Sequence, residues 1–457
     1  MHAMEMPFAA CVCLLLLLQI SAVEPQGPTK VPDIAHIVQR ALMRKEKLPA
    51  GVSDGASFGQ KGDQQPCWEY LWIGHANSTV GPGVTTDLHS FASSVQRFTG
   101  RGDFVYYLDG NQGVDVGLVG HSDHEQLASS TTQTQPSNLV VKHGFPSLEE
   151  KGIHSLVSEA MKPIRQLDKT CELVASYSGH GYNFNGVGYQ EHRFLPWEDL
   201  FDAIAAAFGG PVDLLTLNSC RTADYMTLAQ VQGSAKMVLA SQQTSVYGHV
   251  GSWAYGSIDT AKDALDFAKK TLHHSMPKQR SLASPRGAVS GISLIHMKGF
   301  SDFVRSFEIL LHRLQRRMPE EISHLIQARR STYELAGPTL YAPDNEGMMV
   351  DAGSLLKNLR AAFPPEKRKI QRLIGTAIQK LNEAVLDEEH FPPTAEESGL
   401  TLWFMKPHVN GWHRDLLRSI RQHFSRDVHR RWTSFLEAYY LQAEKATLTD
   451  ADLHVTS

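Results

Sequence analysis

Cysteine is scarce in this sequence, which has five in 457 residues. Two of them, Cys11 and Cys13, lie in an apolar segment near the N-terminus, which leaves Cys67, Cys171 and Cys220 for the rest of the chain. So few cysteines, and an odd number of them, exclude a fold built on disulfides and require at least one free thiol. A pairing of Cys67 with Cys171 is compatible with this number, but the sequence does not determine it.

The chain also lacks an excess of positive charge, because 44 basic residues face 48 acidic ones and the Lys and Arg residues are spread along the chain. This balance excludes a basic surface for nucleic acid, so no nucleic-acid partner is expected. The 22 histidines form no His-Glu-x-x-His sequence and no Cys/His spacing typical of zinc, so no metal site is predicted. After the N-terminal segment no apolar run is long enough to span a bilayer, and no membrane span is expected in the mature chain.

The N-terminal segment is typical of a secretory signal, although no Lys or Arg precedes its leucine run. Small residues at 21 and 22 follow that run and suit cleavage by a signal peptidase. We therefore predict a signal peptide over 1–22 and a secreted or vacuolar protein; a buried apolar segment is the alternative. Residues 23–66 are expected to be a linker or propeptide. The glycosylation sequence at Asn77 is compatible with secretion.

Candidate strands and helices alternate from residue 67 onward, and the second half is richer in apolar residues at helical spacing. This order predicts an α/β fold with a mainly parallel sheet flanked by helices. We divide the chain into a catalytic domain at 67–260, a helix-rich C-terminal part at 261–442 and a polar tail at 443–457. The expected strands are 68–73, 104–108, 172–177, 212–217, 237–240, 292–295 and 400–404, and the expected helices are 84–98, 154–167, 200–208, 260–272, 302–317 and 432–441.

Two of these strands lead into chemically reactive residues, because 172–177 precedes His180 and 212–217 precedes Cys220. In a parallel sheet such residues emerge together at the carboxyl edge if their strands are neighbours. A thiol beside an imidazole can attack a carbonyl carbon, while the imidazole moves the proton. The backbone N–H groups of Gly181 and Cys220 are the expected oxyanion donors. The alternative is a buried structural thiol and a histidine in a turn.

With these two blocks the chain resembles the clan of caspase-like cysteine peptidases, in which one hydrophobic block ends in His-Gly and another in Cys. The sequence SYSGHG is also similar to metacaspases. Several further blocks, taken in their order, resemble the clostripain family more closely than metacaspases or legumains. These blocks are WEYLWIGHAN, VKHGFPSLEEKGIHSLV, MVLASQQTSVYGHVGSWAYG, MVDAGSLLKNL and GLTLWFMKP with WTSFLEAYY, and they span residues 67–442.

The resemblance implies a caspase-like fold for 67–260 and an endopeptidase with a dyad of His180 and Cys220, acting on proteins or peptides. It requires no cofactor for the chemistry, although calcium is compatible with it. It also implies a preference for Arg or Lys before the scissile bond. Family members often carry acidic residues where this chain has Asn218, Gln242 and Gln243. Because a guanidinium is best paired by a carboxylate, we expect this preference to be altered. The expected pocket residues are Asn218, Ser241, Gln242 and Trp253.

Four expectations remain open at this stage. Some members of the family are cut between the two catalytic residues, where Arg193 is the single basic residue of this chain. The segment from Asp109 to Asp115 has oxygen ligands at calcium-like spacing without the closing glutamate, and we expect a solvated loop there. A catalytically silent binding or scaffold protein is the alternative to an enzyme. Acyl transfer or ligation by the same thiol is a third reading.

Overall fold

The computed structural model describes the chain from Cys67 to Val455 with gaps. Its described residues are 67–76, 81–98, 100–110, 113–118, 142–145, 170–181, 186–190, 193–243, 255–283, 290–335, 349–391, 396–406, 417 and 428–455. They belong to one compact unit, Gly59–Ser457. The predicted signal peptide and linker, the predicted helix at 154–167, Asn77 and Trp253 lie outside them.

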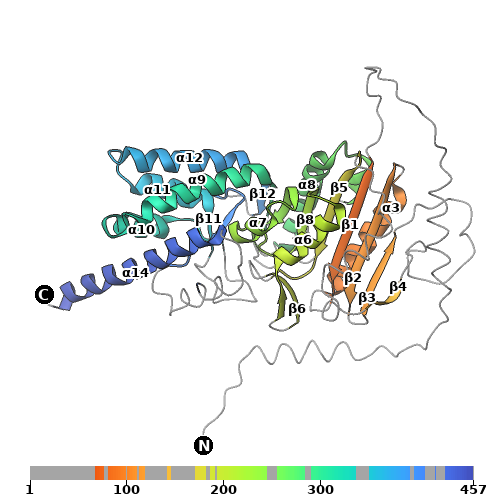
Figure 1. The fold of residues 1–457 in the computed structure, drawn as a ribbon, viewed down its shortest axis with the longest axis horizontal. Helices are drawn as coiled ribbons and strands as arrows, with labels where there is room; N and C mark the ends of the chain where they lie inside the picture. The colour runs from red at the N-terminus through yellow and green to blue at the C-terminus, as the bar shows by residue number, and fades with distance from the viewer. Residues whose placement is uncertain are drawn as a thin grey trace, which may run out of the picture. The chain divides into compact units, whose positions relative to one another are not determined.

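A nine-stranded sheet forms the centre of this unit, with the strand order β12-β10-β9-β8-β5-β1-β2-β3-β4 (Figure 1). The strands β2, β1, β5, β8 and β9 run parallel to one another, and antiparallel strands extend the sheet at both ends. The predicted parallel sheet is thereby confirmed. The bounds are β1 Trp68–His75, β2 Gly102–Gly110, β3 Gly113–Leu118, β4 Lys142–Phe145, β5 Glu172–Ser178, β8 Val212–Asn218, β9 Ala235–Ser241, β10 Ser290–His296 and β12 Val385–Phe391.

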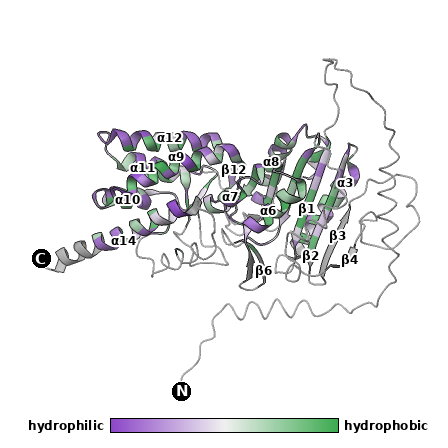
Figure 2. Cartoon of the chain, viewed as in Figure 1, coloured by the Kyte–Doolittle hydropathy of each residue, from purple (hydrophilic) through white to green (hydrophobic). Residues whose placement is uncertain are grey.

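Helices cover both faces of the sheet, as a buried parallel sheet requires. One face packs against α3 (Gly81–Arg97), the short helix η3 (Tyr255–Asp259) and α8 (Ala264–Ala283). The other face packs against α6 (Trp197–Phe208), α7 (Tyr225–Val231) and α9 (Met297–Gln315). The central strands are consequently apolar on both faces, and Figure 2 shows hydrophobic residues along them. Such strands are recognisable in a sequence as short apolar runs without alternation.

The helix-rich C-terminal part continues the second of these cores. Its helices are α10 (Met318–Ser331), α11 (Ala352–Ala362), α12 (Arg368–Ala384) and α14 (Val428–Val455). Their apolar residues join the same cluster as those of α9 and the sheet. A two-stranded sheet of β11 (Met349–Asp351) and β13 (Thr401–Trp403) lies among them. No helix in the described ranges is long and apolar enough to cross a membrane.

The segment 443–457, expected to be a polar tail, is helical as far as Val455 as part of α14. One local prediction was wrong. The expected loop from Asp109 to Asp115 is a hairpin instead. Strand β2 runs to Gly110 and β3 begins at Gly113, and the pairing of these two glycines joins the strands.

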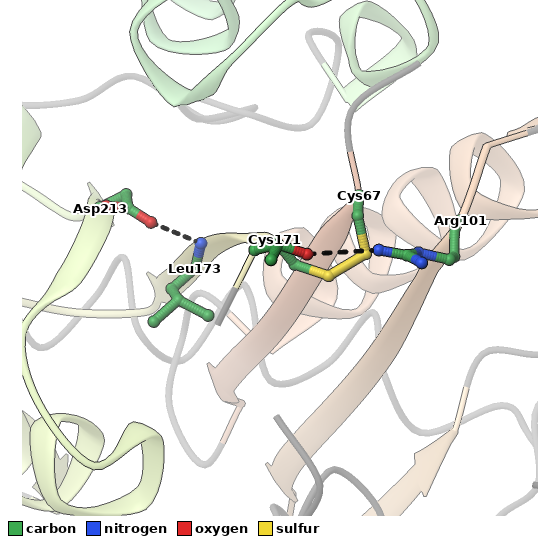
Figure 3. Close-up of a disulfide and its surroundings, with 6 residues drawn as sticks. Cys67, Arg101, Cys171, Leu173 and Asp213 are labelled. Atoms are coloured by element: carbon green, nitrogen blue, oxygen red, sulfur yellow. Dashed lines mark hydrogen bonds between the residues drawn. A yellow bond between two sulfur atoms is a disulfide. The ribbon is translucent and has the colours of Figure 1, made fainter. Parts of the chain in front are cut away.

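A disulfide joins Cys67 and Cys171, with 1.99 Å between the sulfur atoms (Figure 3). Cys67 directly precedes β1 and Cys171 directly precedes β5, and these strands are neighbours in the sheet. Beside the bridge the Leu173 amide donates a hydrogen bond to Asp213 of β8 at 2.8 Å. The disulfide therefore fastens the amino ends of the central strands. Among the described residues Cys220 is the free cysteine, which agrees with the predicted free thiol.

Candidate functional site

The two reactive residues emerge from neighbouring parallel strands. Strands β5 and β8 pair in a register that sets Ser178 opposite Asn218, the last residue of each strand. His180 follows Ser178 by two positions and Cys220 follows Asn218 by two positions, so both leave the sheet at its carboxyl edge. The Gly179 amide donates a hydrogen bond to the Asn218 carbonyl at 3.3 Å, which connects the segments that follow the two strands. The structure thus brings His180 and Cys220 to one edge, as the sequence predicts.

The glycines on either side of His180 are required by close packing. A Cβ atom at Gly179 would lie 2.5 Å from the Tyr177 hydroxyl, and a Cβ atom at Gly181 would lie 2.3 Å from Ser219 Oγ. The same atom at Gly181 would lie 3.0 Å from the carbonyl oxygen of Cys220. Real Cβ atoms do not come this close, so only glycine lets the histidine turn rest against the segment that carries the cysteine.

The His180 side chain is half-buried at this edge, and Tyr177 stabilises the turn that carries it. The Tyr177 hydroxyl donates a hydrogen bond to the His180 carbonyl at 3.1 Å, and the Tyr177 ring packs edge-on against Trp197 of α6. Burial lowers the pKa of the His180 imidazole, and the charge of His75 adds to this effect. His75 is the buried last residue of β1, the other neighbour of β5. His180 therefore favours its neutral form, which can accept a proton.

The segment Ser219–Ala223, called the nucleophile loop below, carries Cys220 and is bonded to the end of β9. The Arg221 amide donates to the Gln243 carbonyl at 2.9 Å, and the Ala223 amide donates to the Ser241 carbonyl at 2.8 Å. Cys220 itself is partly exposed. The loop is thus fixed by its backbone, while the thiol keeps contact with solvent.

Asn218 is fully buried, and its amide faces the α3 side of the sheet. It donates hydrogen bonds to the Asp87 carboxylate of α3 and to Ser178 Oγ, the latter at 3.2 Å. Ser178 in turn donates to Asp87 at 2.6 Å. Position 218 therefore carries an amide, and the carboxylate in this layer belongs to Asp87. Sequence reasoning missed Asp87, because nothing near it in the sequence marks it as a partner of β8.

The predicted pocket residues Ser241 and Gln242 are buried at the end of β9, and Gln242 and its neighbour Gln243 are bonded to acidic residues of the C-terminal part. Ser241 donates to the Gln243 carbonyl at 2.8 Å. Gln242 donates to Asp351 at 3.0 Å and Gln243 donates to Glu397 at 3.1 Å. The chain thus supplies carboxylates beside both glutamines from distant segments. Trp253, the remaining predicted pocket residue, lies outside the described residues.

Each of these two carboxylates has further partners. Asp351 accepts hydrogen bonds from the backbone amides of Ser354 and Ser398, both at 2.7 Å, and so caps α11. Burial raises its pKa to about 6. Glu397 lies 2.6 Å from His390 Nδ1. Burial by itself would lower the pKa of His390, but the carboxylates of Glu388 and Glu397 outweigh it and raise the pKa to about 9.

The predicted processing residue Arg193 lies in a β-hairpin, and two aspartates near Cys220 in sequence have structural roles. Arg193 is the first residue of β7 (Arg193–Leu195), which pairs with β6 (Val187–Gln190). Asp213 lies near the start of β8, at the opposite edge from Cys220, and Asp224 caps α7 by accepting from two of its amides. Neither is free to serve a pocket. His75 was missed as a neighbour of the dyad, although its place at the end of the first strand was a usable signal.

No group of three or more potential metal ligands occurs among the described His, Cys, Asp and Glu residues. The part of the site that the structure describes is therefore built from a thiol, an imidazole, backbone amides and hydrogen-bonded carboxylates. This arrangement can perform nucleophilic attack and proton transfer.

Solved structures with a similar fold are C11, or clostripain-like, cysteine proteases. A secreted C11 protease from Bacteroides thetaiotaomicron, named iotapain, is 9% identical with a TM-score of 0.52, and the match covers 83% of this chain and 100% of that one. A secreted C11 protease from the same organism, in complex with an irreversible peptide inhibitor, is 10% identical with a TM-score of 0.53 and coverages of 81% and 98%. An inactive zymogen C11 protease from Parabacteroides distasonis is 12% identical with a TM-score of 0.52 and coverages of 80% and 99%.

No family model and no curated protein matches the sequence. At these identities the structural likeness concerns the fold. The predicted caspase-like, clostripain-like fold is confirmed by it, whereas the activity and the roles of single residues need their own tests.

Proposed function

We propose that this chain is a cysteine endopeptidase with Cys220 as nucleophile and His180 as its acid–base partner. The observation that carries the proposal is the pairing of β5 with β8, which delivers both residues to one edge of the sheet. The tight contact of Gly181 with the nucleophile loop supports it, as does the partial exposure of Cys220, which forms no disulfide. The likeness of the fold to cysteine proteases agrees with the same chemistry.

In the proposed reaction the proton of the Cys220 thiol passes to His180, and Sγ attacks the carbonyl carbon of the substrate. The N–H groups of Gly181 and Cys220 bind the carbonyl oxygen as it becomes negative. When the C–N bond breaks, His180 gives its proton to the leaving amine, and the acyl group stays on sulfur as a thioester. Water, deprotonated by His180, then hydrolyses the thioester and restores the thiol.

For specificity we propose that a neutral or polar side chain is accepted before the scissile bond. The side chains of Asn218 and Gln242 are amides, and the carboxylates that they contact already accept several hydrogen bonds. An amide offers no full charge to a substrate guanidinium. A peptide library randomised at that position tests this, and cleavage confined to Arg and Lys would contradict it.

For location we propose the secretory route, with 1–22 as a signal peptide and a secreted or vacuolar product. The Cys67–Cys171 disulfide supports this, because such bonds persist in oxidising compartments. Calcium is given no part in the chemistry. Cleavage after Arg193 stays a prediction, and its pairing with Gln190 in the β6–β7 hairpin would have to open for a protease to bind there.

The test is labelling with iodoacetamide or an acyloxymethyl-ketone peptide at neutral pH, followed by identification of the labelled residue. We expect the label on Cys220, none after Cys220→Ala, and peptide turnover that falls by about 100-fold or more after His180→Ala. The exposed His273 gives the control His273→Gln, which should turn over as the unchanged chain does. A folded chain that neither labels nor turns over would establish the scaffold alternative. Adding an amine acceptor during turnover separates hydrolysis from ligation.

A further inference from the structure

Arg221, the residue after the nucleophile, has an unusual backbone. Its φ is 55°, and it is the one non-glycine residue with a positive φ in the described ranges. A left-handed conformation costs a side-chain-bearing residue about 1 kcal/mol or more, and it persists where the surroundings enforce it. Here the enforcing contact is the hydrogen bond from the Arg221 amide to Gln243. The chain could have placed glycine here without strain, yet it carries arginine.

The side chain of Arg221 is unusual as well, because it is only 8% exposed although it follows Cys220 directly and interacts with it electrostatically. Arg329, the other deeply buried arginine, shows the usual arrangement. Its guanidinium donates to Glu334 at 2.9 Å and to the Phe404 carbonyl. No salt bridge of this kind links Arg221 to any carboxylate in the described part of the chain. A buried cation needs an anion nearby, and the adjacent Cys220 is the group whose electrostatic interaction with Arg221 raises the pKa of the guanidinium.

The lowered pKa of His180 suggests a functional role for the interaction between Arg221 and Cys220. A base of low pKa removes a proton poorly from a thiol of ordinary pKa, which is about 8.5. Burial and His75 make His180 such a base. A cation beside the sulfur stabilises the thiolate, which lowers the pKa of the Cys220 thiol toward the pKa of His180. The same thiolate opposes the lowering of the Arg221 pKa that burial causes.

We propose that Arg221 is a positioning residue that stabilises the thiolate of Cys220, so that the thiol proton can pass to His180. The inference rests on the proposed function for its purpose, but the acidity of the Cys220 thiol is measurable without any peptidase activity. The arginine acts through the sulfur and does not touch the scissile bond.

The experiment measures the rate of alkylation of Cys220 by iodoacetamide from pH 5 to 10, with the labelled peptide identified. It uses Arg221→Gly and Arg221→Asn, which suit a left-handed backbone and remove the charge, and Arg221→Lys, which keeps the charge. We expect the midpoint of the pH profile to rise by about one unit in the two neutral variants, with a rate about 10-fold lower on its acidic side. In Arg221→Lys the midpoint should stay near that of the unchanged chain.

Repeating the series in a His180→Ala background separates the two partners, because the rise should persist when the imidazole is absent. Equal midpoints in all variants would overturn the proposal. An equal rise of the midpoint in Arg221→Lys would also overturn the proposal, since the effect would then come from the shape of the arginine side chain and not from its charge. Should the neutral variants not fold, a thiol in the unchanged chain that titrates at or above about 8.5 overturns it equally. Peptide turnover that survives Cys220→Ala would refute the proposed function while leaving these midpoints interpretable.

Discussion

At the scale of single residues, Asn218 shows that a side chain predicted to line a substrate pocket can have a buried structural role. Its amide donates to Asp87 and Ser178 in a fully buried layer between β8 and α3. An amide can donate to a carboxylate, whereas a second carboxylate cannot. The choice of Asn at 218 is therefore coupled to Asp87, and changing one of them alone should disturb the pair.

We predict that Asn218→Asp destabilises the fold by about 3 kcal/mol and gives no gain in cleavage after Arg or Lys. The reason is that two buried carboxylates would share one site, so that one of them has to be neutral. The loss should be smaller at pH 5 than at pH 8, because protonation relieves the repulsion. Urea unfolding at both pH values measures the first effect, and a peptide library measures the second.

The control is the double variant Asn218→Asp with Asp87→Asn, which exchanges the amide and the carboxylate. It should recover more than half of the lost stability, because one donor and one acceptor again face each other. If the double variant loses as much free energy of unfolding as the two single variants lose together, or more, Asp87 and Asn218 are not coupled in this way.

At the scale of elements, the end of β9 connects the nucleophile loop to the C-terminal part. Gln243 accepts from Arg221 through its carbonyl and donates to Glu397 through its side chain. Glu397 is held by His390 of β12. The charge on His390 therefore helps to position Glu397, which is connected to the nucleophile loop through Gln243.

We predict that this contribution fades in alkaline solution. The pKa of His390 is raised to about 9 in the folded chain, above the unfolded value of about 6.5. Its stabilisation is therefore complete below about pH 6.5 and is lost as the pH rises through about 9. His390→Gln should lower the free energy of unfolding at pH 6, and the difference from the unchanged chain should shrink by pH 10.

Urea unfolding between pH 6 and 10 measures this difference. The exposed His273, which lies beside Asp387 and Glu389, provides the matched variant His273→Gln. Its effect should stay within about 0.5 kcal/mol at every pH, because exposed ion pairs contribute little. A pH-independent loss in His390→Gln would mean that packing, and not charge, is what His390 supplies.

The sequence predicts the arrangement of the strands and their reactive ends better than it predicts the side-chain hydrogen bonds around the site. The parallel strands and the exit of His180 and Cys220 at one edge of the sheet were predictable, because each apolar run and its reactive end are adjacent in sequence. The hydrogen bonds that support the site were not. Asn218 and Asp87 are 131 residues apart, and Gln243 and Glu397 are 154 apart. Such pairs follow from how helices dock on the sheet, and no local pattern records this docking.

At the scale of the whole molecule, the sheet separates a structural edge from a chemical edge. The disulfide joins residues that precede β1 and β5, whereas His75, His180 and Cys220 lie at or beyond the carboxyl ends of the strands. Strand β5 has seven residues, so about 20 Å of strand lies between the two edges. Stability and reactivity should therefore respond separately to loss of the bond.

We predict that the double variant Cys67→Ala with Cys171→Ala loses about 4 kcal/mol of stability but keeps the pH profile of Cys220 alkylation. The bond closes a loop with a sequence separation of 104 residues, and removing it frees the unfolded chain by about that amount. The native strands remain paired by their backbone hydrogen bonds, so the carboxyl edge keeps its geometry below the unfolding transition. Urea unfolding and alkylation kinetics on the same preparation test both halves. A changed midpoint for Cys220 in the folded variant would show that the amino edge controls the site, and the separation of the two edges would then be wrong.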